Sequence, residues 1–328
     1  MHGGLWFRGR ARAARLIPDG ARPHARALKH VARFRSAQAR LLLPAGPTSS
    51  AERAFIVGCG RSGTTLLGML VGAHSRVDYL LEPYHRWAVV DPDTDTPHLY
   101  FRTSTRWILT SADVTARTRD RYRRVFPARP GRLLVEKNPN NTVRIGYLRA
   151  LAPEARYVHI ARDGASVARS IAGVARREDP TISGKPGFRW WWGADDARWT
   201  ALVLDSERFG HFPREVTRLV THEERGLAEW IVSMREMERF EDELGDRLLT
   251  VRYEDLVTHP EETLSAVLEF LGLPVEPGPL ALARRSVRPA PSAGAGDLSL
   301  PPGLAREFNR LQEKYGFEAR VGEAASSA

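Results

Sequence analysis

Residues 54–67, AFIVGCGRSGTTLL, limit what this chain of 328 residues can fold into more than any other stretch. An apolar run from Ala54 to Val57 breaks into a glycine-bearing loop, and the loop opens directly into a second apolar segment. This order predicts a strand, a loop and a helix, with backbone N–H groups and the helix N-terminus converging on an anion. Glycines in the loop would let the backbone approach that ligand closely.

The loop differs from the nucleoside-triphosphate pattern G-x-x-x-x-G-K-[ST] at one position. Gly58 and Gly63 have the required spacing, but Thr64 stands where the pattern needs lysine. Because that lysine contacts the β- and γ-phosphates, a metal-dependent triphosphate site would lack its main charge partner. The cation of this loop is Arg61, which together with nearby hydroxyl side chains suits a short anion with two charged groups. The alternative is a glycine-rich turn that binds nothing.

A second stretch, residues 157–171 (YVHIARDGASVARSI), also predicts a strand, a turn and a helix. Arg162 follows the strand, where its guanidinium could bind a phosphate through two N–H groups. Ser166 and Ser170 are four residues apart and would share one face of the helix. The alternative is an ordinary strand–helix turn in which Asp163 caps the helix.

The segment RSGTTLL (61–67) resembles the 5′-phosphosulfate loop of sulfotransferases that use 3′-phosphoadenosine 5′-phosphosulfate (PAPS). It is most similar to the branch with arginine in the loop, to which the protein-tyrosine (tyrosylprotein) sulfotransferases belong. Residues 157–171 and RYEDLVTHPEETLSAVLEFLGLP (252–274) extend the resemblance, which covers roughly residues 53–275. The family implies an α/β fold of the P-loop-like type in three layers, with a mostly parallel central sheet flanked by helices. The alternation of strands and helices along the chain predicts the same class.

The resemblance also implies which residues bind PAPS. One group would hold the 5′-phosphosulfate, and a second group would hold the 3′-phosphate. The first group is Gly60, Arg61, Ser62, Gly63, Thr64 and Thr65, and the second is Arg162 and Ser170.

Transfer of a sulfuryl group to a hydroxyl needs a base for the acceptor proton. Residues 76–85 (RVDYLLEPYH) predict a strand with Glu82 at its carboxyl end, the edge of an open parallel sheet where ligand groups gather. In the tyrosylprotein branch a glutamate after this second strand is the base, and Glu82 aligns with it. Two alternatives stay open. Glu82 could be a solvated loop carboxylate, or His85 could be the base, because imidazole titrates near neutrality.

Residues 133–145 (LLVEKNPNNTVRI) predict a further strand that ends at Lys137. The resemblance places such a lysine against the sulfonate or the bridging oxygen. Arg61 and Lys137 would then neutralise the charge that develops on the departing 5′-phosphate. The prediction is an in-line, metal-free transfer from PAPS to the hydroxyl of a carbohydrate, lipid or natural product. Two other functions stay open: a P-loop kinase or nucleotide hydrolase, which needs the missing lysine, and a non-catalytic nucleotide-binding adaptor.

The formal net charge of +10 is concentrated in the first 50 residues. This leader holds ten Lys and Arg residues against one acidic residue, Asp19, so residues 51–328 carry only about +1. Because the positive and negative charges of residues 51–328 are nearly equal in number, this part of the chain is not expected to bind nucleic acid. Within the leader, apolar residues from His24 to Leu43 recur at roughly helical spacing. This pattern predicts either a basic helix on an anionic membrane surface or a helix packed against the domain.

Residues 51–318 would form the sulfotransferase domain, with an insertion on the acceptor side at about 174–245. The insertion contains four tryptophans that would either line an acceptor pocket or cover the core: Trp190, Trp191, Trp192 and Trp199. Its second part, residues 222–244, predicts one long amphipathic helix. Residues 319–328 are small and polar and are expected to be disordered.

The sequence has no apolar span long enough for a transmembrane helix and no clear apolar core of a signal peptide. Its single cysteine, Cys59, excludes an intramolecular disulfide. The expected location is therefore the cytoplasm, where PAPS would be supplied, with or without attachment to a membrane surface.

Overall fold

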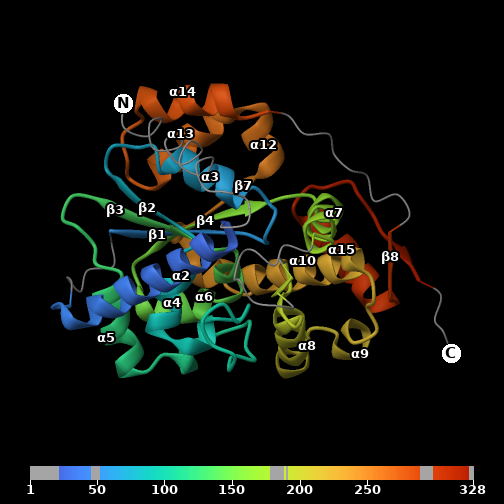
Figure 1. The fold of residues 1–328 in the computed structure, drawn as a ribbon. Coiled ribbons are helices and arrows are strands. Elements are labelled where there is room, and N and C mark those ends of the chain that lie inside the picture. Colours follow the sequence, from blue (N-terminus) through green and yellow to red (C-terminus); the bar gives the residue numbers. More distant parts are fainter. Residues whose placement is uncertain (1–21, 46–51, 178–187, 190, 289–297, 325–328) are drawn as a thin grey trace.

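The computed structural model describes residues 22–45, 52–177, 188–189, 191–288 and 298–324. Five parallel strands form its central sheet in the order β2-β3-β1-β4-β7 (Figure 1). The strands are β1 (Arg53–Val57), β2 (Val77–Leu81), β3 (Leu133–Lys137), β4 (Arg156–Ala161) and β7 (Leu248–Arg252). The first four confirm the strands that the apolar runs of the sequence predict.

Two layers of helices cover the sheet because successive strand residues face opposite sides. In β1, Ala54 and Ile56 face one layer, whereas Phe55 and Val57 face the other. The first layer comprises α3 (Thr64–Val71), α12 (Tyr253–Thr258), α13 (Pro260–Phe270) and α14 (Pro277–Ser286). The second comprises α4 (Tyr84–Val90), α5 (Ala116–Val125) and α6 (Ile145–Leu151). The predicted three-layer, P-loop-like α/β fold is confirmed.

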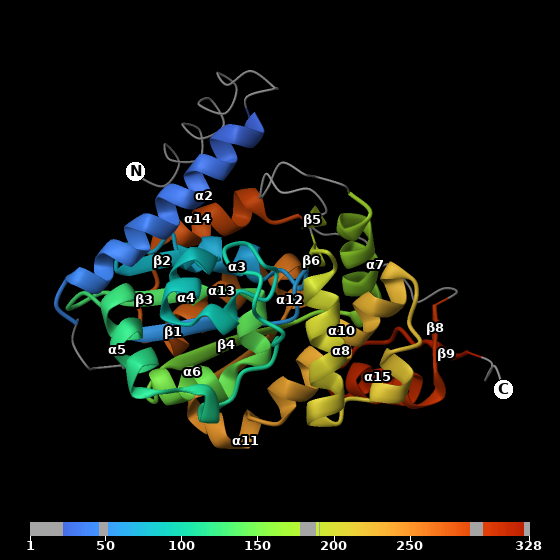
Figure 2. The same cartoon turned by 60° about the horizontal axis from the view of Figure 1, so that its bottom comes forward.

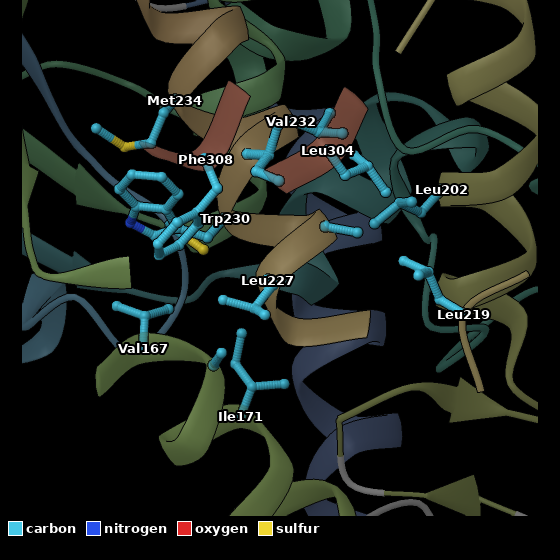
Figure 3. Close-up of a cluster of buried hydrophobic side chains, with 14 of the residues drawn as sticks. Val167, Ile171, Leu202, Leu219, Leu227, Trp230, Val232, Met234, Leu304 and Phe308 are labelled. Atoms are coloured by element: carbon cyan, nitrogen blue, oxygen red, sulfur yellow. The ribbon is translucent and has the colours of Figure 1, made fainter. Parts of the chain in front are cut away.

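A helical extension lies beside the sheet and has its own buried cluster (Figure 3). It is formed by α7 (Gly164–Ala175), α8 (Ala197–Phe209), α9 (Pro213–Val216), α10 (His222–Glu238) and α15 (Pro302–Lys314). Trp230 of α10 packs against Phe308 of α15, with their ring centroids 5.0 Å apart. Val167 and Ile171 of α7 belong to the same cluster, so α10 and α15 support the helix that follows β4. A short antiparallel pair, β5 (Phe188–Arg189) and β6 (Gly193–Ala194), precedes α8.

The long helix expected over residues 222–244 is shorter in the structure. Helix α10 ends at Glu238, and a separate short helix, α11 (Glu241–Leu244), follows it. Between the two helices, Phe240 leaves the helical path and places its ring beside Gly146 in the cluster beneath the sheet. Phe240 has a φ of −112° and a ψ of 0°, outside the α-helical range, so the regular helix is interrupted at this residue.

The C-terminal segment is ordered further than expected. Residues 319–324 lie in the part predicted to be disordered, yet β9 (Gly322–Glu323) pairs in parallel with β8 (Ser299–Leu300). Val321 is buried in the cluster of α15, and Gln312 donates a hydrogen bond to the carbonyl oxygen of Ala319 at 3.1 Å. These contacts tie down a segment whose composition alone suggests disorder. Residues 325–328 lie outside the described residues.

The leader contains helix α2 (Arg22–Ala39), which continues into a short 3₁₀ turn, η2 (Arg40–Leu42). Figure 2 shows α2 running along the outside of the molecule. It packs against α4, and Ala37 is buried. The ring of Phe34 stacks on Tyr100, which lies in the loop after α4, with their ring centroids 4.9 Å apart. None of the helices in the described ranges combines the length and the apolar character that a bilayer crossing requires.

His159 in β4 makes the stability of the sheet sensitive to acid. Its side chain is fully buried, and burial, followed by the charge of Lys314, lowers its pKa from 6.5 to about 3. The native state therefore binds fewer protons than the unfolded state, so stability is present above pH 6.5 and is lost as the pH falls. Between pH 6.5 and 5, the loss from this group is expected to be roughly 2 kcal/mol.

Urea unfolding of His159→Phe across this pH range measures that loss. Phenylalanine keeps an aromatic ring beside Tyr315, which His159 meets edge-on at 5.7 Å. Other titrating groups, including Glu136, whose pKa burial raises to about 7, are present in both proteins and cancel in the comparison. A variant whose stability falls with pH as steeply as the wild type would contradict the assignment.

Candidate active site

The carboxyl ends of β1, β2, β3 and β4 surround a cavity of about 240 Å³. It opens where the loop between β1 and α3 meets the residues that follow the other strands. Eight of the ten site residues expected from the sequence line this cavity: Gly60, Arg61, Gly63, Thr64, Thr65, Glu82, Lys137 and Arg162. The other two do not line it: Ser62 belongs to the same loop, and Ser170 of α7 accepts a hydrogen bond from the loop residue Arg61.

Glu82 and Lys137 meet because their strands are parallel neighbours. Leu81 is paired with Lys137 in the register, and the Glu82 N–H donates to the Lys137 carbonyl oxygen at 2.8 Å. The Lys137 ammonium forms an ion pair with Glu82 Oε1. The Lys137 side chain is 2% exposed and that of Glu82 37%, so the carboxylate faces the opening while the ammonium lies deeper. Glu82 also has a φ of +45°, a left-handed conformation that a non-glycine residue adopts only when its surroundings impose it.

The two arginines of the site are linked through the loop backbone. Arg162 donates to the Arg61 carbonyl oxygen at 3.0 Å, and its guanidinium lies 4.3 Å from the ring centre of Tyr253. Arg61 Nε donates to Ser170 Oγ at 3.0 Å. Burial and, next, the nearby charge of Arg162 lower the pKa of Arg61. Two guanidinium groups held this close favour binding of an anion, which would relieve their repulsion.

This arrangement brings together residues that the sequence places at opposite ends of the ligand. Arg61 is expected at the 5′ end and Ser170 at the 3′ end, yet the two side chains are hydrogen-bonded. The link runs between the phosphate-type loop and α7, two elements that sequence spacing cannot place relative to each other. Arg61 thus links the loop after β1 to helix α7.

The hydroxyl group of Ser62 is buried within the loop. Its N–H donates to the Cys59 carbonyl oxygen at 3.1 Å, whereas its buried Oγ has no hydrogen-bond partner among the described residues. A buried hydroxyl without a partner costs free energy unless a ligand or water satisfies it. The loop is therefore suited to a polar ligand.

His85, the alternative base, does not line the cavity. It lies in α4, where burial and then Arg86 lower its pKa to about 4. Glu82 is the carboxylate that the structure brings to the cavity beside Lys137. In the described part of the chain, no group of three His, Cys, Asp or Glu side chains is arranged to hold a metal ion. The metal-free reaction stays a prediction.

Two aromatic side chains also line the cavity: Trp191, for which the sequence left a pocket or a core position open, and Tyr253, to which it assigned no role. Tyr253 directly follows β7, so its place at the end of a parallel strand was a usable signal. Trp191 comes from the insertion and covers Gly60, where a Cβ would lie 2.5 Å from the indole ring. Such a contact between distant segments leaves no local pattern in the sequence.

Trp191 is held from behind by a buried ion pair. Its indole N–H donates to Glu229 Oε2 at 2.8 Å, and Arg198 donates to Glu229 Oε1 at 2.5 Å. The Arg198 guanidinium also lies 4.6 Å from the centre of the Trp191 ring. Trp192 and Trp199, by contrast, pack edge-to-face at 5.7 Å within the core, and Trp190 lies outside the described residues. The insertion thus both covers the core and reaches the cavity.

Gly63 is expected to tolerate no side chain. Its φ is +93°, and an added Cβ would overlap the Tyr253 ring. Gly63→Ala is therefore expected to lower the free energy of unfolding by about 1–3 kcal/mol and to weaken ligand binding in the loop. Thermal unfolding measures the effect. Gly173→Ala is the matched control, because among the described residues nothing beyond its own helix lies within 4 Å of the added Cβ, and alanine favours a helix. Equal melting temperatures for the two variants would contradict the role of Gly63.

Comparison with known proteins identifies the family. A family model described as "Sulfotransferase family" matches residues 53–219 and 207–277, which together make up more than half of the chain. The chain belongs to the sulfotransferase family. It is therefore an enzyme of sulfuryl transfer, as the sequence resemblance predicts, whereas its likeness to the tyrosylprotein branch stays a prediction. No curated protein matched this sulfotransferase significantly.

Several solved structures described as sulfotransferases are similar to this chain. The sulfotransferase domain of the Synechococcus PCC 7002 olefin synthase is 18% identical, with a TM-score of 0.46, over 81% of this chain and 94% of that domain. Sulfotransferase STF9 of Mycobacterium avium is 14% identical, with a TM-score of 0.48, over 92% of this chain and 83% of its own. Mouse sulfotransferase SULT7A1, solved with PAP, is 14% identical, with a TM-score of 0.38, over 76% of this chain and 68% of its own.

Proposed function

We propose that this sulfotransferase moves the sulfuryl group of PAPS to an acceptor hydroxyl, with Glu82 as the base. One observation carries the proposal: a carboxylate and a buried ammonium, Glu82 and Lys137, are paired at a cavity that Arg61 and Arg162 also line. This combination supplies a proton acceptor and three positive charges at one place. Sulfuryl transfer between two oxygens needs both.

The residues of the loop fit a phosphosulfate group. Gly60 and Gly63 bring no side chain between the backbone and a ligand, and the N-terminus of α3 points into the cavity through Thr64 and Thr65. The unpartnered hydroxyl of Ser62 lies within the same loop. Arg162 and Ser170, which meet Arg61 from the β4–α7 side, are proposed to hold the 3′-phosphate.

In the proposed mechanism, the acceptor oxygen attacks sulfur while its proton passes to Glu82. The new S–O bond forms opposite the bond to the 5′-phosphate oxygen, which breaks and keeps the electron pair. Arg61 and Lys137 stabilise the negative charge that develops on this oxygen. The products are a sulfate ester and adenosine 3′,5′-bisphosphate (PAP), and the proton on Glu82 is released to solvent.

The ion pair between Glu82 and Lys137 explains why PAPS would bind before Glu82 accepts a proton. Without a ligand, the ammonium neutralises the carboxylate. An anion entering the cavity competes for Lys137, which lies deeper than Glu82 and has few other ways to satisfy its charge. Binding of PAPS would thereby free the carboxylate to accept a proton.

The acceptor in this proposal is a carbohydrate, a lipid or a natural product with a hydroxyl group. Trp191 brings an indole from the insertion to the cavity, and an indole face suits a sugar ring or an apolar ring system. The likeness to the tyrosylprotein branch is used for the base alone, because other pocket residues set the substrate. The reaction is placed in the cytoplasm, and the balanced charge of residues 51–328 gives no reason to propose a nucleic-acid partner.

Radiolabelled PAPS mixed with the purified protein and a panel of cell extracts tests this function. Label is expected to appear in an extract component, which mass spectrometry then identifies as a sulfate ester. Magnesium-dependent turnover of ATP would instead favour a P-loop kinase or nucleotide hydrolase. Binding of PAPS without transfer to any extract would favour a nucleotide-binding adaptor.

Arg162→Gln is expected to weaken binding of PAP by about a hundredfold, because it removes a charge-assisted contact to the 3′-phosphate. Binding of AMP, which lacks that phosphate, is expected to change much less. Isothermal titration calorimetry measures both affinities. Arg176→Gln is the matched control, since Arg176 lies at the end of α7, pairs with Glu223 and is 58% exposed. Equal losses for PAP and AMP in Arg162→Gln would place the arginine elsewhere on the nucleotide.

A further inference from the structure

Helix α2 has two different faces. His30, Phe34, Ala37 and Leu41 form an inner face that is buried or half-buried against the body. The opposite stripe is exposed from Leu28 onward, and we call it the outer face of α2. It consists of Leu28, Val31, Ala32, Arg35 and Ala39 of α2, together with Leu42 of the adjoining turn η2. The spacing of three and four residues places these side chains in line.

The outer face gathers an unusual share of exposed apolar side chains. Eight large hydrophobic residues are exposed in the described part of the chain, and three of them belong to the outer face. Leu28 is 69% exposed, Val31 57% and Leu42 87%. Scattered single residues of this kind need no explanation, but a contiguous stripe indicates a surface that something else covers.

The charge of the same segment is of one sign. Residues 22–45 contain six Lys and Arg residues and no acidic residue. Arg35 interrupts the apolar stripe near its middle, where its guanidinium donates to Gln38 at 3.2 Å. A protein partner would need complementary apolar and charged groups at fixed positions. An anionic bilayer has no such requirement, because leucine and valine can enter its interface and cations in any arrangement can contact its surface.

We propose that the outer face of α2 docks on an anionic membrane surface. Leu28, Val31 and Leu42 would enter the interfacial region, while Arg35 contacts lipid phosphates. The inner face stays packed on α4, so the contact needs no unfolding or detachment of the helix. Since α2 lies along the outside of the molecule (Figure 2), the body would rest on the membrane through this helix. This docking is independent of the chemistry at the cavity.

Vesicle sedimentation of the full chain tests the proposal, with phosphatidylcholine vesicles that either contain or lack phosphatidylglycerol. The wild type is expected to bind the anionic vesicles, and added salt should weaken the binding. Leu28→Gln combined with Val31→Gln is expected to lower the affinity by about tenfold or more. Both positions are exposed, so the melting temperature should be unchanged.

Leu204→Gln combined with Val220→Gln is the matched control, because these two side chains are also exposed, at 40% and 77%, but lie outside α2. The control variant is expected to bind like the wild type. Equal binding of the wild type to neutral and anionic vesicles would overturn the proposal. So would full binding by the variant of Leu28 and Val31, which would move the contact to residues 1–21 or to another surface. Loss of sulfuryl transfer with vesicle binding intact would concern the cavity alone.

Discussion

Turnover is expected to fall by about a thousandfold when Glu82 is replaced by glutamine. The amide has nearly the same shape and can still accept a hydrogen bond from Lys137, but it cannot take a proton from the acceptor at neutral pH. Binding of PAP should be essentially unchanged, because Glu82 opposes the charge of an anion and does not hold it. Steady-state rates with radiolabelled PAPS and the acceptor found in extracts measure the first effect, and calorimetry measures the second.

His85→Gln is the control for Glu82→Gln. His85 lies in the helix that follows Glu82 but does not line the cavity, so the variant is expected to keep its turnover. The increase of rate with pH that a base produces should be present in this control and absent from Glu82→Gln. If His85→Gln loses turnover while Glu82→Gln keeps it, the base has been assigned to the wrong residue.

Lys137→Met is expected to lower kcat by about a hundredfold to a thousandfold, since it removes a buried positive charge beside the leaving oxygen. Methionine is unbranched and fits an apolar environment, and Glu82 is 37% exposed, so its charge stays hydrated when the ammonium is gone. The protein should therefore fold. The KM for PAPS is expected to change less than kcat, because Arg61 and Arg162 still line the cavity.

A double variant tests whether Glu82 and Lys137 act in the same catalytic step. If Glu82 and Lys137 act in one step, Glu82→Gln with Lys137→Met should be about as slow as the slower single variant. Lys314→Met is the matched lysine control, because Lys314 pairs with Glu238 and Glu241 and does not line the cavity. A loss in Lys137→Met that appears only in the KM for PAPS would contradict a role at the leaving oxygen.

The strands and the loop could be predicted from the sequence because their signals are local. Apolar runs predicted β1 to β4, the rule that ligand groups gather at the carboxyl ends of parallel strands predicted the place of Glu82, and the family resemblance implied that Lys137 would reach the same site. Their direct ion pair follows from the neighbouring order of β2 and β3, which only the structure shows.

Other features depend on contacts between distant segments. Trp191 reaches the cavity because a buried ion pair between Glu229 and Arg198 holds its indole, and no spacing rule connects these residues. The hydrogen bond from Arg61 to Ser170 likewise joins two elements whose separation the sequence does not give. The sequence could not decide whether the leader helix packs on the domain or contacts a membrane, because both faces of α2 carry apolar residues. The structure shows which face the body of the protein covers.

Calorimetric titration of the wild type with PAP and with AMP tests most directly whether the cavity binds PAPS at both of its anionic ends. The two nucleotides differ by the 3′-phosphate alone. We expect PAP to bind about a hundredfold more tightly than AMP, because Arg162 would give that phosphate a charge-assisted contact. Equal affinity for PAP and AMP, or tighter binding of magnesium–ATP than of PAP, would contradict the account.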